Sequence, residues 1–110
     1  MSREVLGNFE LMVLLALIRL GDGAYGVPIC QTIEESTGRE VLVGSVYAAL
    51  ERLEAKRFVA SMVGEPTAER GGRAKRYFHI TRGGLQQVRQ MRSALTRLWH
   101  GIPALEGASR

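Results

Sequence analysis

Two short segments with alternating apolar side chains, FVASMVG (58–64) and RAKRYFHI (73–80), follow each other in a chain whose other patterned segments have helical spacing. The residues between them include one proline and the pair Gly71-Gly72, which favour a tight turn. The sequence therefore predicts a single β-hairpin among helices, a mainly α fold of the α+β class. With 110 residues the chain suits one small domain, which we expect to span 1–110.

Two helices are predicted at the N-terminal end. Asn8 can cap a helix over about residues 9–20, which glycines at 21 and 23 would end. This helix is apolar on nearly all sides, so we expect one face to pack within the domain and another to pack on a partner. A second helix follows the GDGAYG turn and closes at Thr37-Gly38. Its apolar cluster consists of Val27, Ile29, Cys30 and Ile33.

The segment VGSVYAALERLEAKRF (43–58) predicts a third helix. Ser45 or the residue before it can cap this helix, and its inner stripe is Val46, Leu50 and Leu53. The residues that must then face outward are Tyr47, Ala48, Glu51 and Arg52. Two helices joined by a short glycine-containing turn are typical of a helix-turn-helix. The hairpin behind them would be the wing of a winged helix-turn-helix over residues 6–80.

A closing helix is predicted from Thr81, which can cap it, to about His100. Its apolar residues recur every three or four positions, which indicates a seam for another helix. We expect residues 81–102 to be a C-terminal dimerisation helix, because so small a chain buries only part of its apolar surface by itself. The expected homodimer interface consists of Met12, Leu15, Ile18, Leu95, Leu98 and Trp99.

Charge is unevenly distributed along the chain. Residues 1–54 carry four Arg against eight Asp or Glu, whereas residues 55–110 carry eleven Lys or Arg against three Glu, so the net charges are −4 and +8. Most of the cations are Arg, whose planar donors suit phosphate and guanine edges, and this favours a polyanion as partner. At the hairpin tip the residues expected to meet the DNA backbone or to enter a minor groove are Arg70, Arg73, Lys75 and Arg76. The alternative is that these cations only solubilise and protect an exposed strand edge.

The segments GNFELMVLLALIRLGDGAYGVPI, GSVYAALERLEAKRFV and GEPTAERGGRAKRYFHITRGG resemble the PadR family of transcriptional regulators in order and spacing, over roughly residues 6–102. The resemblance implies a bacterial winged-helix homodimer that represses transcription by binding double-stranded DNA, and two-fold symmetry favours a pseudo-palindromic operator. It also implies that the helix-turn-helix contacts DNA through Tyr25, Ser45 and Tyr47, and the wing through Arg73, Lys75 and Arg76.

Three positions leave alternatives open. Tyr47 either contacts DNA or is a packed aromatic that supports the wing. Trp99 either lines a dimer-interface pocket for a small aromatic effector, as the resemblance suggests, or only packs in the dimer. Arg57 stands where the family usually has Gly, and it would cost roughly 1 kcal/mol if the turn there is left-handed.

Other classes of function find no support in the sequence. No arrangement of side chains suits catalysis, and the wing glycines lack the ending of a phosphate-binding loop. His79, His100 and Cys30 lack ligand spacing, so we expect no metal or cofactor. The longest apolar run, 11–18, is too short for a membrane helix, and a lone cysteine fits a reducing cytosol, so a cytoplasmic protein is expected. The alternative function is a winged-helix protein-interaction module that does not read DNA.

Overall fold

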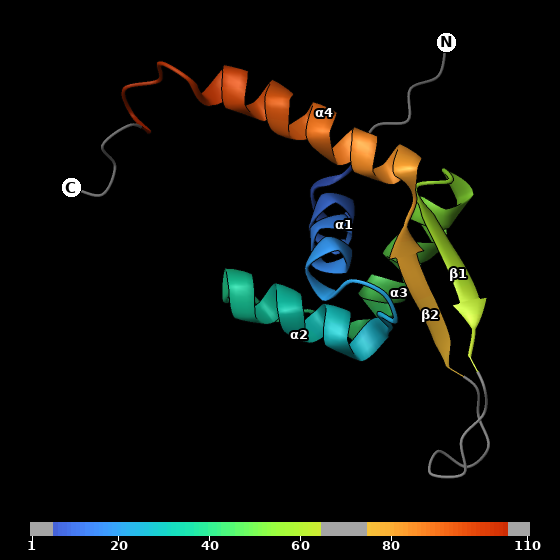
Figure 1. Cartoon of the computed structure of the whole chain (residues 1–110). Helices are drawn as coiled ribbons and strands as arrows, with labels where there is room; N and C mark the ends of the chain where they lie inside the picture. The colour runs from blue at the N-terminus through green and yellow to red at the C-terminus, as the bar shows by residue number, and fades with distance from the viewer. Residues whose placement is uncertain (1–5, 65–74, 106–110) are drawn as a thin grey trace.

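A computed structural model describes residues 6–64 and 75–105 of the chain. Three helices come first, then a β-hairpin and a long closing helix (Figure 1). The elements are α1 (Asn8–Leu20), α2 (Gly26–Thr37), α3 (Val43–Ala55), β1 (Val59–Val63), β2 (Arg76–Ile80) and α4 (Arg82–Trp99). The predicted α+β fold, a winged helix-turn-helix between an N-terminal and a C-terminal helix, is confirmed.

The helices α1, α2 and α3 pack against one another and enclose the core. The hairpin stands beside α3, while α4 crosses over α1 and extends past it (Figure 1). The core is built from apolar residues of every element, and its largest fully buried side chains are Val13, Leu14, Leu17, Ile29, Val46, Leu50, Leu53, Val59 and Phe78. The predicted inner stripe of α3 is therefore confirmed. One prediction for α2 is wrong: Val27 is 50% exposed, because it lies about 200° around the helix from buried Ile29.

The starts of two helices differ from the prediction. Gly7, not Asn8, occupies the N-cap of α1, and its backbone N–H donates to Glu10 Oε1 at 3.1 Å. The Glu10 carboxylate thus satisfies an amide at the start of the helix without a capping side chain. Helix α3 begins after Leu42, so Ser45 lies in its first turn rather than at its cap. Thr81 caps α4 as predicted, and its Oγ1 accepts from the Gly84 N–H at 3.0 Å.

The two strands of the hairpin are antiparallel, and their register runs from Val59 opposite Ile80 to Val63 opposite Arg76. The other edge of β2 is covered at one point, where the Phe78 N–H donates to the Ala24 carbonyl at 2.7 Å. This bond ties the turn between α1 and α2 to the hairpin. The base of the hairpin is therefore fixed to the helical core by both packing and backbone pairing.

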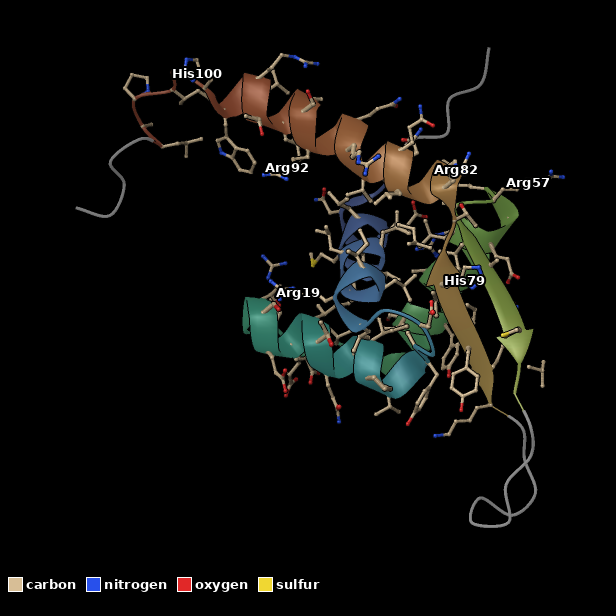
Figure 2. The ribbon with its side chains drawn as sticks, in the orientation of Figure 1. Arg19, Arg57, His79, Arg82, Arg92 and His100 are labelled. Atoms are coloured by element: carbon tan, nitrogen blue, oxygen red, sulfur yellow. The ribbon has the colours of Figure 1, made fainter. Side chains whose placement is uncertain are left out.

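The turn between α3 and β1 is left-handed at Arg57, whose φ is 68°. The Phe58 N–H closes the turn by donating to the Leu53 carbonyl at 2.9 Å, and Thr81 Oγ1 donates to the Arg57 carbonyl at 2.8 Å. The Arg57 side chain points away from the body of the protein (Figure 2). The sequence left the geometry of this turn open. Because the turn is left-handed, a non-glycine residue in it costs about 1 kcal/mol.

Candidate nucleic-acid interface

The contact between α2 and α3 is centred on Tyr47. Its hydroxyl accepts a hydrogen bond from the Gly26 backbone N–H at 3.2 Å, and its ring lies edge-on to Phe78 with centroids 6.2 Å apart. A Cβ at Gly26 would lie only 2.5 Å from the Tyr47 ring, so the first turn of α2 leaves room for the ring only because residue 26 is glycine. Tyr47 is still 37% exposed. The side chain supports the packing of the fold and also presents an edge to solvent.

The outward face of α3 carries small, apolar and hydroxyl groups in its first two turns. Tyr47, Ala48, Glu51 and Arg52 are exposed, as predicted, and Ser45 in the first turn is exposed as well. Two residues at the start of the helix were not predicted to be part of this surface: Leu42 is 76% exposed and Val43 is 42% exposed. At 100° per residue both lie within about 60° of Val46, on the side of the inner stripe, so the helical spacing did not mark them as exposed. The exposed start of α3 is therefore apolar rather than charged.

The beginning of β2 lies against the beginning of α2. Lys75 Nζ is 3.8 Å from the centroid of the Tyr25 ring, a cation–π contact, and the Tyr25 ring meets the Tyr77 ring edge-on at 5.8 Å. Tyr25 is the N-cap residue of α2, next to the amide that Tyr47 binds. The structure thus brings together Tyr25, Tyr47 and Lys75, three residues predicted from separate parts of the sequence.

The other predicted wing residues have different surroundings. Arg76 lies on the face of β2 that looks toward α3, and its Nη2 donates to Glu54 Oε1 at 2.6 Å. The Arg76 side chain remains 43% exposed. Arg70 and Arg73 lie outside the described residues. Ser45 is exposed in the first turn of α3, and its side chain joins none of the contacts around Tyr25 and Tyr47.

A buried carboxylate anchors the far half of α3. Glu10 is 5% exposed and accepts hydrogen bonds from Arg52 Nε at 2.8 Å and Lys56 Nζ at 2.9 Å, in addition to the Gly7 N–H. Burial by itself would raise the pKa of Glu10, but the hydrogen bonds from these partners outweigh it and lower the pKa from 4.5 to about 2. The ionised carboxylate therefore ties the start of α1 to the last turns of α3 at any physiological pH.

The residues predicted to form a dimer interface lie along α1 and α4. A cavity of about 460 Å³ between these helices is lined by residues that include Leu15, Ile18, Leu95 and Trp99, with Arg89 and Arg92. Met12 lines a smaller groove of about 170 Å³ between α1 and α2. Leu98 is 72% exposed and Trp99 is 55% exposed near the end of α4. Arg92 extends from α4 beside this surface (Figure 2). These apolar side chains form a surface that this chain by itself leaves open to solvent.

The described residues hold no group of three or more His, Cys, Asp or Glu side chains that could bind a metal ion. Cys30 is buried, and its Sγ donates to the Val41 carbonyl at 3.3 Å. Burial, assisted by the nearby Glu34 carboxylate, raises the pKa of the Cys30 thiol, so the thiol stays protonated. Within 6–64 and 75–105, no helix combines the length and the apolar character needed to cross a bilayer.

A helix-turn-helix with an exposed second helix, followed by a hairpin with cations on its return strand, defines a winged-helix DNA-binding protein. The model of the PadR-like family of transcriptional regulators matches residues 14–90. The chain belongs to this family, so it is a DNA-binding transcriptional regulator and not an enzyme. None of the curated proteins matches the chain as a relative.

Solved structures have the same architecture. A transcriptional regulator from Clostridium thermocellum is 25% identical with a TM-score of 0.71, and the match covers 88% of this chain and 91% of that one. A PadR family regulator from Clostridium difficile R20291 is 21% identical with a TM-score of 0.69, covering 84% and 91%. A PadR family regulator from Eggerthella lenta is 23% identical with a TM-score of 0.69, covering 87% and 81%. The last two likenesses concern the fold alone.

Proposed function

We propose that the protein is a homodimeric repressor that binds a pseudo-palindromic operator in double-stranded DNA. The observation that carries the proposal is the convergence of Tyr25, Tyr47 and Lys75 beside the exposed start of α3. A helix of this kind enters the major groove with its N-terminal residues toward the base edges. A dimer seated across the operator excludes other proteins from that DNA, and this steric exclusion is the mode of repression that we propose.

The division of roles follows from the chemistry of the side chains. Ser45 and Tyr47 read bases, and the exposed methyl groups of Leu42 and Val43 contact thymine methyl groups. Tyr25 and Lys75 contact the phosphate backbone, together with Arg70 and Arg73 of the wing. Arg76 donates two of its five N–H groups within the protein, to Glu54 and Ser61, and its remaining donors contact phosphate.

The dimer in this proposal forms through the apolar surface of α1 and α4. Each subunit covers the Leu98 and Trp99 side chains that the other exposes, in an isologous two-fold interface. Such an interface fixes the distance between the two recognition helices, which are the α3 helices of the two subunits, to about one turn of DNA, roughly 34 Å. We include in the proposal that a small aromatic effector stacks on Trp99 in the cavity between α1 and α4 and releases the DNA. The site of action that we propose is the cytoplasm.

Selection from a random duplex library tests the proposal. The full-length protein is expected to enrich an inverted repeat, and its affinity for that repeat should fall steeply between dilute and physiological salt because several Arg and Lys of each subunit displace counterions. If no sequence is enriched, or if the affinity does not depend on salt, DNA reading is ruled out. That result would favour a winged helix whose apolar helices bind another protein.

A further inference from the structure

Three side chains join the last turn of α3 to both strands of the hairpin. Glu54 Oε1 accepts from Arg76 Nη2 at 2.6 Å, and Glu54 Oε2 accepts from Ser61 Oγ at 2.7 Å. Ser61 Oγ in turn accepts from Arg76 Nε at 3.2 Å. The three contacts form a closed ring that uses both carboxylate oxygens and both the donor and the acceptor of the hydroxyl. We refer to Glu54, Ser61 and Arg76 as the wing clamp.

Strand register explains why these side chains meet. Ser61 lies opposite Phe78, so Arg76, two residues before Phe78, is the diagonal neighbour of Ser61 on the same face of the hairpin. The Arg76 guanidinium also lies 5.0 Å from the centroid of the Phe78 ring, which limits its range of orientations. Glu54 reaches this face from α3. One carboxylate therefore holds a helix and two strands in a fixed relation.

The outer part of the hairpin needs such a contact. A two-stranded hairpin has marginal stability on its own, and the base of this one is secured by the buried side chains of Val59 and Phe78. Further along β1, Met62 is 63% exposed and Val63 is 70% exposed, so these side chains do not pack in the core. On β2 the Tyr77 ring meets the ring of Tyr25, the N-cap residue of α2, but this contact does not reach α3. Among the described residues, the wing clamp supplies the side-chain hydrogen bonds that join α3 to this outer part.

We propose that Glu54 and Ser61 are positioning residues for DNA binding, which hold the wing at a fixed angle to the recognition helix through Arg76. This inference rests on the proposed function. A wing held in its binding orientation loses less conformational freedom when DNA binds than a loosely attached one. The charge of Glu54 alone would oppose binding to a polyanion, so its removal would strengthen binding if the residue had no positioning role. If the wing clamp positions the wing, removal of the Glu54 charge should instead weaken DNA binding.

The experiment compares Glu54→Gln with Glu35→Gln, which removes the same charge from an exposed position on α2 that takes no part in the proposed DNA contacts. Affinity for the selected operator duplex is measured by fluorescence anisotropy, and hydrogen exchange of the hairpin amides is measured without DNA. We expect Glu54→Gln to bind about fivefold more weakly, as for loss of one partly exposed ion pair, and Glu35→Gln to bind equally well or more tightly. Exchange in β1 and β2 should be faster in Glu54→Gln than in the wild type, and unchanged in Glu35→Gln. Ser61→Ala, which changes no charge, should resemble Glu54→Gln in both measurements.

The outcomes separate this inference from the proposed function. If Glu54→Gln binds as tightly as Glu35→Gln, the positioning role is wrong. It is also wrong if Glu54→Gln and Ser61→Ala both bind more weakly but neither shows faster hairpin exchange. If the wild-type protein selects no DNA but hairpin exchange is faster in Glu54→Gln and Ser61→Ala, the wing clamp stabilises the hairpin. In that case the proposed function is wrong.

Discussion

The Tyr47 hydroxyl accepts a hydrogen bond from the Gly26 backbone N–H across 3.2 Å, and it thereby joins α3 to the first turn of α2. The two residues are 21 positions apart in sequence. The two readings of Tyr47, packed aromatic and DNA contact, are therefore not exclusive, because one face of the ring packs while 37% of the residue stays exposed. A substitution at Gly26 would therefore displace Tyr47 on the proposed DNA surface, although Gly26 itself is not part of that surface.

Gly26→Ala is expected to weaken both folding and operator binding. The new Cβ would lie 2.5 Å from the Tyr47 ring, so the ring has to move. Overpacking of this kind costs about 1 to 3 kcal/mol. Gly44→Ala is the control, because a Cβ there meets nothing within 4 Å and alanine favours the helix. Chemical denaturation checks the difference, and equal stability of the two variants would contradict the role of Gly26.

Glu10→Gln is expected to destabilise the protein by about 2 kcal/mol at neutral pH, because it removes the charge that Arg52 and Lys56 bind. The pKa of Glu10 is lowered to about 2 in the folded protein, so its contribution is complete above the unfolded value near 4.5 and is lost as the pH falls toward 2. The difference in unfolding free energy between wild type and variant should shrink over that range. Glu35→Gln, at an exposed position on α2, should show no such pH dependence.

Arg57→Gly is expected to stabilise the protein by about 0.5 to 1 kcal/mol, because glycine adopts the left-handed conformation at φ 68° without strain. Arg57→Ala keeps the Cβ and should give no such gain, so this variant separates backbone strain from loss of the side chain. Thermal unfolding checks both variants. Equal melting temperatures for the Gly and Ala variants would show that strain at this turn is negligible.

Thymine methyl groups in the operator are expected to contribute to affinity through Leu42 and Val43. Replacement of contacted thymines by uracil removes only the methyl group, and each replacement should weaken binding about fourfold, as for one buried methyl group. Leu42→Ala combined with Val43→Ala should bind thymine and uracil operators equally. If the double variant keeps the preference for thymine, other residues read these methyl groups.

Leu98→Glu is expected to abolish dimerisation and operator binding together, because it places a carboxylate in the proposed apolar interface. Gln90→Glu adds the same charge at another exposed position of α4 and should leave the dimer intact. Sedimentation at micromolar concentration measures the assembly, and anisotropy measures DNA binding. A wild-type monomer, or a Leu98→Glu variant that still binds its operator as a dimer, would refute the proposed interface.

The sequence predicted the elements whose apolar residues repeat with a regular period. The inner stripe of α3 and the alternation around Phe78 follow from local geometry, since a helix or strand has to bury one face. Contacts between distant segments produce no such repeat in the sequence. Glu10 meets Arg52 across 42 positions, and the spacing of either helix by itself gives no sign of that pair. The wing clamp is hidden for the same reason, because it depends on the register of the two strands.

Thr81 is the N-cap of α4, so a small change of the helix angle there would displace the far end of α4 by a large distance. The Thr81 hydroxyl donates to the Arg57 carbonyl and accepts from the Gly84 N–H, and the Thr81 N–H donates to the Phe58 carbonyl at 3.0 Å. Three hydrogen bonds therefore fix the start of α4. With 18 residues, α4 is about 27 Å long, and a tilt of about ten degrees at Thr81 would move its far end by about 5 Å. A small change in the angle of α4 at Thr81 would thus become a large displacement of Trp99, and the three hydrogen bonds of Thr81 limit that change.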